Sequence, residues 1–356
     1  MNVELARGRV ECLVRLARRI QDERDEIGQE ARQRLPEVTG LTQASIELAL
    51  SQHFETEPTA EELDKLIKSV TSAPVCHVIM SANVFTAPLR ALALAVATSP
   101  RVFVRASRRD PVMTDLLIRM LASDRQFAAF DGVIDMHEKL HVGPGHELHI
   151  YGSDESIAAI VNGLPAGVLV RAHGTGIGLA IVGENIDLIA AAEALAQDVG
   201  VFDQRGCLSP RFVFVEGGED RAERFCVELE KTMWDFSFCF GGGVLDAGLQ
   251  AEIARYQATM EAIGSYWQGS SYAVGFDPAP RALLLPPAAR IAHVVPANVA
   301  NMDNLLDPWI RYVTAIGLDG ESGLSRMLKE KVPWARWSRL GFMQRPPLDG
   351  PVDGRT

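Results

Sequence analysis

Hydrophobic residues in the first 70 positions recur at three- and four-residue spacing, which is the period of an amphipathic helix. Between residues 10 and 31 the apolar side chains share one face and charged residues occupy the other positions. Because proline disfavours a helical conformation in the preceding residue, we expect this helix to stop at Leu35 and Pro36. Thr59 and Glu62 form a capping box that starts a later helix. The pattern predicts an N-terminal helical segment over residues 1–70.

From about residue 74 the pattern alternates between short apolar runs and helical stretches. Asp110 and Pro111 are expected to start one of these helices, and Ser153 is expected to cap another that runs to about residue 162. Strands alternating with helices indicate βαβ units and a parallel sheet, here over residues 71–200. Such a sheet binds ligands where its strands end. The predicted strands are 75–80, 101–105, 148–151 and 168–171.

A second α/β domain is predicted over residues 201–340. A segment of loop character at 202–210 leads into a strand at 211–215. Two long helical stretches follow near 219–236 and 247–263, and a further strand-like run covers 292–296. The tail, 341–356, contains prolines and glycines without periodicity, so we expect an extended segment on the surface.

Composition and charge restrict the function classes. The 356 residues are 47% hydrophobic and 23% charged, which is ordinary for a globular protein with a sizeable core. Lys plus Arg number 35 against 46 Asp plus Glu, and the net charge of −11 argues against nucleic acid or a membrane surface as partner. The longest apolar run, 91–97, is too short to span a bilayer.

The five cysteines are scattered and form no CxxC pair, which argues against a disulfide framework and a thiolate zinc site. The first residues lack the basic start and apolar core of a secretory signal. We therefore expect a soluble, cytoplasmic protein with reduced thiols.

Residues 137–141 spell HExxH, the string of zinc proteases. That chemistry requires both histidines on one helix face, with the glutamate as base beside the metal. Here Gly143 and Pro144 follow at once, and the string lies in a predicted loop before a strand. We interpret it as a solvated, histidine-rich loop and expect no metal site.

The glycines at 174, 176 and 178 resemble a phosphate-binding turn. Their spacing is GxGxG, not the GxGxxG of dinucleotide-binding proteins, and no acidic residue ends a neighbouring strand at the expected distance. A tight turn after the strand at 168–171 is the simpler interpretation. A turn near a ligand is also compatible, since glycine allows close backbone approach.

Cys207 is the strongest candidate for a nucleophile. It lies in a turn-like stretch between Gly206 and Ser209, with Arg205 two residues away, whereas Cys76 lies in an apolar run typical of packing. A nucleophilic cysteine needs exposure, nearby positive charge or amides, and small neighbours. Asn83 follows the strand at 75–80, where an amide donor could stabilise an oxyanion. Alternatively, Asn83 only caps a turn.

Four segments together resemble the acyl-CoA reductase (LuxC-like) family of the aldehyde dehydrogenase superfamily. The matches run in order along most of the chain, and the strings DQxxCLSP and MQRPPLD are specific. The segments are CHVIMSANV (76–84), RASRRDP (105–111), FDQRGCLSP (202–210) and MQRPPLD (343–349).

This resemblance implies an aldehyde-dehydrogenase-like fold with a Rossmann-like nicotinamide-cofactor domain and an α/β catalytic domain. It also implies reduction of a fatty acyl-CoA to the aldehyde through an acyl-cysteine on Cys207. Asn83 would be the oxyanion donor, together with the backbone amide of Cys207. The resemblance further implies NADPH as cofactor and a homo-oligomer.

The same resemblance implies residues that contact the cofactor. Arg105 replaces the usual lysine, which favours a 2′-phosphate but alters the geometry, and Gly152-Ser153 replaces an expected glycine pair. No glutamate matches the base that activates water in hydrolytic relatives; Glu184 is a poor candidate, and this absence suits a reductase. The implied residues are Arg105 and Ser107 near the adenosine ribose, and Gly152, Ser153, His173 and Gly174 near the pyrophosphate and nicotinamide.

Three other interpretations compete with an acyl-CoA reductase. The thioester donor could be an acyl carrier protein, which the net charge disfavours, although Arg105, Arg108 and Arg109 form a local basic patch. The chain could be an inactive family member that serves as a scaffold, against which both Cys207 and Asn83 are present. A zinc hydrolase is the third.

Overall fold

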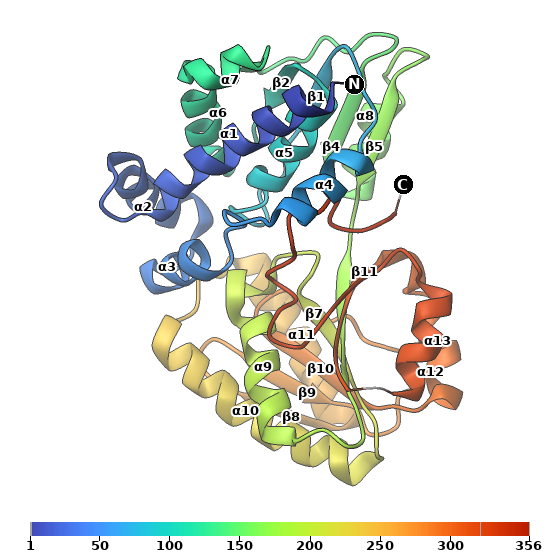
Figure 1. Ribbon diagram of the computed structural model, residues 1–356. Helices are drawn as coiled ribbons and strands as arrows, with labels where there is room; N and C mark the ends of the chain where they lie inside the picture. The colour runs from blue at the N-terminus through green and yellow to red at the C-terminus, as the bar shows by residue number, and fades with distance from the viewer. Residues whose placement is uncertain (1, 321, 356) are drawn as a thin grey trace. The chain divides into compact units, whose positions relative to one another are not determined.

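Figure 1 shows the computed structural model of the chain, which describes residues 2–320 and 322–355. The chain divides into two units. Unit 1 holds the residues up to Thr175 together with Pro347–Val352, and unit 2 holds Gly176–Pro346 together with Asp353–Arg355.

Unit 1 is built around a parallel sheet in the order β3-β2-β1-β4-β5. The chain starts in the centre at β1, moves outward to β3, and then returns to β4 on the other side of β1. The strand order therefore reverses between β1 and β4, which is the point where open α/β sheets bind ligands. The strands are β1 (Cys76–Ile79), β2 (Arg101–Arg105), β3 (Val133–Met136), β4 (Glu147–Tyr151) and β5 (Leu169–His173).

The helices of unit 1 cover this sheet. Every residue of α5 is buried, and α5 contacts both β1 and α1. On the β4–β5 side, Ile157 of α8 packs on Leu148 and Ile150. The helices are α1 (Val3–Gln21), α2 (Glu26–Thr39), α3 (Gln43–Gln52), α4 (Ala60–Ser69), α5 (Pro88–Thr98), α6 (Val112–Ser123), α7 (Arg125–Ala129) and α8 (Asp154–Val161).

The first helix differs from the prediction. We expected one helix up to Leu35 and Pro36, but α1 ends at Gln21, and Pro36 lies inside α2. The carboxylate of Asp25 accepts the amide of Ile27 at 2.9 Å and starts a new helix, an alternative that aspartate offers the backbone. Pro36 stands in the last turns of α2, where it removes one hydrogen bond without ending the helix.

Two predicted helix caps are confirmed, and the third differs from the prediction in where its helix begins. Thr59 and Glu62 form both bonds of the capping box at the start of α4, at 3.2 and 2.9 Å. Ser153 caps α8. Helix α6 begins at Val112, one residue later than predicted, with Pro111 at the cap position. The carboxylate of Asp110 accepts the backbone amide of Val112.

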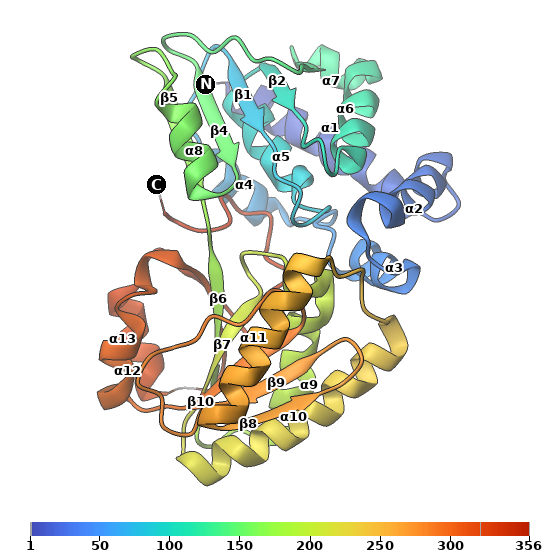
Figure 2. The same ribbon diagram turned by 180° about the vertical axis from the view of Figure 1, so that it is seen from behind.

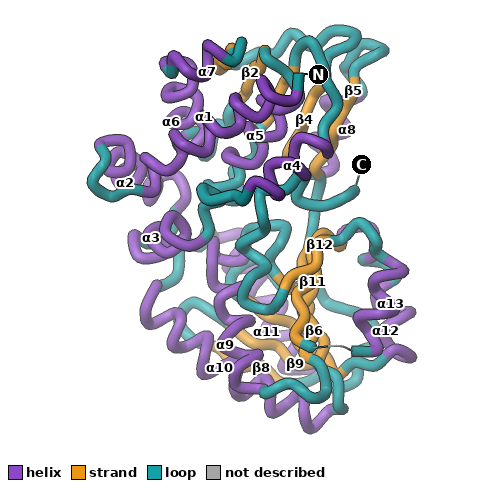
Figure 3. The backbone as a smooth tube through the Cα atoms, in the orientation of Figure 1, coloured by secondary structure: helices purple, strands orange, loops and turns teal. Residues whose placement is uncertain are grey.

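Unit 2 contains a mixed sheet, and strands are drawn in orange in Figure 3. Its order is β12-β11-β6-β7-β10-β9-β8, and among the described strands of this sheet only the β8–β9 pair is antiparallel. The strand predicted at 211–215 is β7, and the strand predicted at 292–296 is β10. The strands are β6 (Ile177–Val182), β7 (Pro210–Val215), β8 (Ser265–Gln268), β9 (Ala273–Phe276), β10 (Ile291–Pro296), β11 (Val313–Asp319) and β12 (Arg336–Ser338).

Both faces of this sheet are buried. Val213 of β7 packs toward α9 and α10, whereas its neighbours Phe212 and Phe214 pack toward α12 and α13. Strands buried on both faces carry continuous apolar runs, as residues 212–215 of β7 do. Helix α11 covers the β8–β9 end (Figure 2). The helices are α9 (Leu188–Gly200), η1 (Val201–Gln204), α10 (Glu219–Phe240), α11 (Ala247–Ile263), α12 (Val299–Leu306), η2 (Ile310–Tyr312) and α13 (Gly323–Lys331).

The division between the units differs from the predicted boundary near residue 200. β6 and α9 lie in unit 2, because β6 pairs with β7 and β11 in the second sheet. The short segment 174–176, which we took for a turn inside the first domain, is where the chain passes from one unit to the other.

The tail is extended as predicted, but much of it is buried and does not lie on the surface. Met343 and Leu348 are 0% and 1% exposed. The carboxylate of Asp198 in α9 accepts the amides of Gly341 at 2.6 Å and Met343 at 2.9 Å. Burial raises the pKa of Asp198 to about 7, although these amides oppose the shift. The start of the tail is thus fastened to unit 2.

Among residues 2–320 and 322–355, no helix is long and apolar enough to cross a membrane.

Candidate active site

The predicted cofactor residues and Asn83 all lie where strands of the unit 1 sheet end. Asn83 follows β1, Arg105 ends β2, Gly152 follows β4 and His173 ends β5. Backbone bonds join these ends: the Met80 amide donates to Arg105 at 3.0 Å, and the Gly152 amide donates to His173 at 3.2 Å. In a parallel sheet these ends share one edge, so the structure brings this set together at the point where the strand order reverses.

The start of α8 is an acidic part of this edge. Ser153 uses its hydroxyl to cap the helix, and Asp154 and Glu155 occupy the first turn. The Asp154 carboxylate accepts the amide of Thr175 at 2.8 Å. A Cβ atom at Gly174 would meet that carboxylate at 2.3 Å, so a larger residue there would require the Asp154 side chain to move. The helix dipole favours an anion at this end, but two carboxylates already occupy it.

Positive charge lies instead beyond the end of β2. Arg105 is half-buried, and Arg108 and Arg109 are exposed in the loop that follows. The Ser107 hydroxyl accepts the amide of Arg109 at 3.3 Å and orders this loop. Arginine binds phosphate oxygens in a bidentate manner, so this end of the edge fits a nucleotide phosphate better than the start of α8 does.

His173 and Tyr151 form a paired ring surface between β4 and β5. Their ring centroids are 4.4 Å apart and the rings are inclined by only 7°. The two residues are direct partners across the strands. Asn83, by contrast, is exposed in a bend, where its amide is accessible to a ligand.

Cys207 lies in unit 2 in a turn, and its side chain is half-buried. Cys12, Cys76 and Cys226 are buried, and burial raises the pKa of each of these thiols. Cys239 is exposed on α10. Cys207 is therefore the cysteine that combines accessibility with a loop of small residues, the setting that a nucleophile requires.

The backbone just before Cys207 is unusual. Phe202, Asp203 and Gln204 have φ angles of 57°, 50° and 61°, in the left-handed region. Such a conformation costs on the order of 1–3 kcal/mol for each non-glycine residue and persists only where the surroundings enforce it. The three residues and Cys207 belong to the segment 202–210, which we call the nucleophile loop.

Gln204 clamps one side of the nucleophile loop. Its side-chain nitrogen donates to the carbonyls of Pro210 at 2.8 Å and Ile291 at 2.7 Å, and its oxygen accepts the amide of Ile291 at 2.8 Å. Gln204 is 0% exposed. The loop is thereby tied to the starts of β7 and β10.

Asp203 clamps the other side. It forms an ion pair with Arg290 at 2.8 Å, and both residues are buried. Asp203 also accepts the amide of Gly243 at 3.1 Å. Arg205, which we expected to supply positive charge near Cys207, approaches Asp203 instead, at 3.4 Å. Its charge is thus partly compensated inside the loop.

Two glycines allow β6 to lie directly against Cys207. A Cβ atom at Gly176 would come within 2.4 Å of Thr314 and 3.0 Å of the Cβ of Cys207. At Gly178 it would meet the carbonyl oxygens of Leu208 and Ser209 at 2.5 and 2.7 Å. Gly176 and Gly178 of the GxGxG run therefore allow close packing within the protein, which is neither of the two interpretations that we drew from the sequence.

Thr314 of β11 completes the support of the loop. Its hydroxyl donates to the carbonyl of Ile177 at 3.1 Å and contacts that of Cys207. Glu184 lies beyond the other end of β6, which at about 3.3 Å per residue puts it roughly 20 Å from the end beside Cys207. It is exposed and is no candidate for activating water at Cys207.

Sequence reasoning missed most of these supporting residues. Asp203 and Gln204 belong to the DQxxCLSP string, so the motif itself was their signal. Arg290 and Thr314 had none, because Arg290 lies in the turn before β10, Thr314 lies within β11, and each meets the loop only after folding.

We expect Gln204→Met to lower the free energy of unfolding by about 1–3 kcal/mol, because buried carbonyls and an amide lose their partner. The measurement is urea unfolding followed by circular dichroism. Gln250→Met is the matched control, since Gln250 is exposed on α11. If both variants unfold like the unmodified chain, Gln204 does not hold the loop.

The HExxH string lies in a loop between β3 and β4, as predicted. Over the described ranges 2–320 and 322–355, no group of three or more His, Cys, Asp or Glu residues could hold a metal ion. The nearby histidines interact with one another instead: His77 of β1 and His146 approach at 3.0 Å, and their rings stack.

This histidine pair predicts a pH effect on stability. Burial, followed by the neighbouring His146, lowers the pKa of His77 to about 4. Below pH 6.5 His77 is protonated in the unfolded chain, whereas in the folded chain it stays neutral down to about pH 4. The free energy of unfolding therefore falls as the pH falls. Between about pH 7.5 and pH 5 we expect a loss on the order of 2 kcal/mol from this residue. Urea unfolding of His77→Gln should show a weaker pH dependence; an unchanged dependence would contradict this.

Comparison with protein families gives one match. The family described as acyl-CoA reductase (LuxC) matches residues 41–354. A search of curated proteins found no match.

Solved structures of aldehyde dehydrogenases share the fold. The NAD-dependent benzaldehyde dehydrogenase of Corynebacterium glutamicum has a TM-score of 0.69 and 14% identity, covering 96% of this chain and 80% of its own. A glyceraldehyde-3-phosphate dehydrogenase of Methanocaldococcus jannaschii, complexed with NADP, has a TM-score of 0.62 and 13% identity, covering 93% of this chain and 80% of its own. The Rhodopseudomonas palustris propionaldehyde dehydrogenase with bound propionyl-CoA has a TM-score of 0.61 and 14% identity, covering 94% of this chain and 81% of its own. The predicted aldehyde-dehydrogenase-like α/β fold is confirmed.

Proposed function

The chain belongs to the acyl-CoA reductase (LuxC) family, and we propose that it reduces a long-chain acyl-CoA to the aldehyde through an acyl-cysteine on Cys207. The observation that carries this proposal is the nucleophile loop, in which a half-buried cysteine follows three residues of left-handed conformation. The side chains of two of these residues, Asp203 and Gln204, hold the loop in place. A strained backbone with this much support is expected where a side chain must be presented to a substrate.

The chemistry assigned to Cys207 is a thioester exchange. Its thiolate attacks the acyl carbonyl, the C–S bond to CoA breaks, and CoA leaves as a thiol after taking a proton. Both sides of the exchange are thioesters, so the protein mainly has to supply the thiolate and stabilise the oxyanion. We assign the backbone amide of Cys207 and the side-chain amide of Asn83 as oxyanion donors. When the thiohemiacetal collapses, the aldehyde is released and the thiolate is restored.

We assign the carboxyl edge of the unit 1 sheet to the nicotinamide cofactor. A reduced nicotinamide bound there would supply the hydride that converts the acyl-cysteine to the thiohemiacetal. NADPH is favoured over NADH because Arg105, Arg108 and Arg109 suit a 2′-phosphate. The residues assigned to hold it are Arg105 and Ser107 at the ribose, and Gly152, Ser153, His173 and Gly174 along the β4 and β5 ends.

The thioester donor has two candidates. Acyl-CoA is favoured because the net charge of −11 repels an acidic acyl carrier protein. The basic patch at Arg105, Arg108 and Arg109 is the feature that would favour the carrier protein. Comparing turnover of palmitoyl-CoA, a short acyl-CoA and palmitoyl carrier protein distinguishes these substrates.

The experiment that tests the proposal is mass spectrometry after incubation with palmitoyl-CoA without NADPH. We expect a palmitoyl mass on the peptide that contains Cys207, which disappears with release of aldehyde when NADPH is added. Absence of acyl transfer at Cys207, in a preparation that still makes aldehyde, would overturn the proposal.

A further inference from the structure

Residues 353–355 of the tail belong to unit 2 and are seated beside the strand that supports the nucleophile loop. The amide of Gly354 donates to the carbonyl of Trp334 at 2.9 Å. The indole of Trp334 in turn donates to the carbonyl of the first residue of β11 at 3.0 Å. The next residue of that strand is Thr314, whose hydroxyl contacts the carbonyl of Cys207. We call residues 353–355 the tail segment.

Arg355 is held in one orientation within the tail segment. Its side chain is 20% exposed, and the buried carboxylate of Asp353 accepts hydrogen bonds from its Nε at 3.0 Å and its Nη2 at 3.2 Å. The same carboxylate accepts the backbone amide of Arg355 at 2.9 Å, and the carbonyl of Arg311 accepts Nη1 at 3.3 Å. Two nitrogens bound to one carboxylate fix the plane of a guanidinium, so the position of this charge is defined.

The Arg355 guanidinium lies close to Cys207, and Gly176 is the residue between them. A Cβ atom at Gly176 would be 3.0 Å from the Cβ of Cys207 and 3.2 Å from Nη2 of Arg355. Nη2 therefore lies within about 6 Å of the Cys207 Cβ, a range over which an opposite charge favours the ionised form of a neighbouring group. Because residue 176 is glycine, no side chain at this position separates the guanidinium from the thiol.

Two segments bring charged side chains near Cys207, the nucleophile loop and the tail segment. In the loop, Arg205 faces Asp203 at 3.4 Å, and Asp203 also pairs with a buried arginine of the turn before β10. β6 and β11 pack on Cys207 with glycines and a threonine, so these contacts bring no charge to it. The tail segment adds the guanidinium of Arg355, which Asp353 fixes and also partly screens.

We propose that Arg355 stabilises the thiolate of Cys207 and thereby makes this cysteine reactive near neutral pH. The inference rests on the proposed function, in which this thiolate attacks the thioester. A cysteine is a nucleophile in its ionised form, and an adjacent cation raises the fraction that is ionised. The proton of the thiol passes to solvent, and no other bond changes. The role that the sequence suggested for Arg205 thus falls to a residue that is distant in sequence.

Alkylation of Cys207 by iodoacetamide as a function of pH tests this role without any turnover. Mass spectrometry of the peptide that contains Cys207 gives the rate, and the midpoint of the rate profile is the pH at which half of the thiol is ionised. In Arg355→Gln we expect the midpoint to rise by about 0.5–1 pH unit, since Asp353 already screens part of the charge. The plateau at high pH should be equal or higher, because a more basic thiolate is a better nucleophile. The midpoint of Arg355→Lys should lie between those of Arg355→Gln and the unmodified chain.

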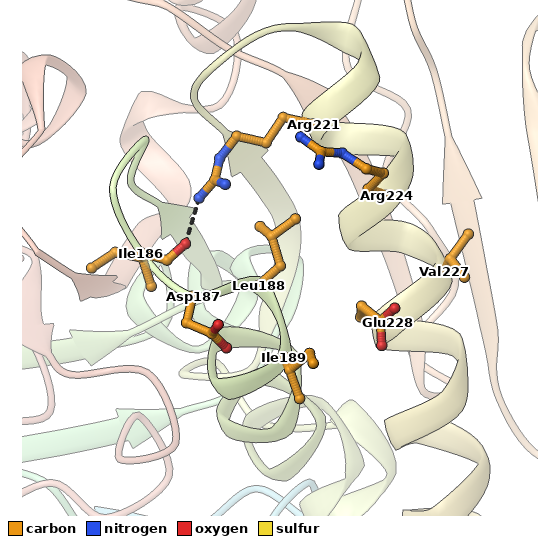
Figure 4. Close-up of a pocket in the computed structure, with 8 residues that line it drawn as sticks. All are labelled: Ile186, Asp187, Leu188, Ile189, Arg221, Arg224, Val227 and Glu228. Atoms are coloured by element: carbon orange, nitrogen blue, oxygen red, sulfur yellow. Dashed lines mark hydrogen bonds between the residues drawn. The ribbon is translucent and has the colours of Figure 1, made fainter.

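Arg224→Gln is the matched control, because it removes the same charge near the other end of the sheet. Arg224 lines a hollow between the starts of α9 and α10 (Figure 4). α10 starts after β7 ends, whereas Cys207 precedes β7, so much of that strand's length of about 20 Å lies between the two residues. The midpoint of Arg224→Gln should not move. Exposed Cys239 is an internal control whose alkylation should be the same in all variants, and circular dichroism establishes that each variant is folded.

Acyl transfer from palmitoyl-CoA should follow the same shift. We expect Arg355→Gln to be acylated about two- to fourfold more slowly than the unmodified chain at pH 7, and at least as fast at about pH 9.5. An unmoved alkylation midpoint in Arg355→Gln overturns the inference. So does a rate that rises at every pH without a shift, because the tail segment would then only shield the thiol. A midpoint that moves in a chain that is never acylated at Cys207 leaves this inference intact and contradicts the proposed function.

Discussion

Replacing Cys207 with alanine should abolish aldehyde formation while the chain stays folded. Without the thiolate there is no covalent intermediate, and removal of a nucleophile from an enzyme that depends on one lowers turnover on the order of 10⁴-fold or more. The fold should survive because the side chain is only half-buried and the loop is held by Gln204 and Asp203. Aldehyde production and NADPH consumption measure the loss, and intact-mass analysis should find no acylated protein.

Cys239 provides the matched control for this prediction. Cys239→Ala removes an exposed thiol from the same unit and should keep both acyl transfer and turnover. Cys207→Ser should also be nearly inactive, because its hydroxyl is not ionised at neutral pH. Aldehyde formation by Cys207→Ala at the rate of the unmodified chain would eliminate both the CoA and the carrier-protein forms of the mechanism.

The strands and most helix positions were predictable because their physical causes are local. The alternation of 71–175 and the mainly apolar sequences of β7 and β10 can be recognised from neighbouring residues. The break at Asp25 was missed because the apolar spacing continues through it, while one side-chain bond to Ile27 decides the outcome. The start of unit 2 was missed because β6 and α9 continue the same alternation. Only pairing with β7 and β11 assigns β6 to the second sheet.

The candidate site likewise has residues that local sequence identified and residues that only the folded structure revealed. Cys207 and Asn83 stood out from their immediate neighbours and from the motifs that contain them. The support around Cys207 depends on contacts that are distant in sequence: Gln204 and Ile291 are 87 residues apart, and Thr314 and Cys207 are 107 apart. No local pattern encodes such contacts. The glycines at 176 and 178 were visible, but their role became clear only when β6 was found against the nucleophile loop.

Asn83→Ala should lower kcat/KM by about 10²–10³-fold, equivalent to about 2.7–4 kcal/mol, as expected when one oxyanion donor is lost. The effect should fall mainly on kcat, because the donor acts on charge that develops only in the transition state. Asn83 is exposed in a bend after β1, so truncation opens no cavity and the melting temperature should stay unchanged. Steady-state kinetics with palmitoyl-CoA, together with thermal unfolding, give the two measurements.

Two further variants separate this role from a turn cap. Asn83→Asp keeps the shape and the capping oxygen but places negative charge where an oxyanion forms, so it should be at least as inactive as Asn83→Ala. If Asn83 only caps its turn, aspartate would restore activity. Asn304→Ala, an exposed asparagine on α12, should have the kinetics of the unmodified chain. Normal kcat in Asn83→Ala would remove this residue from the reaction and leave the backbone amide of Cys207 as the assigned donor.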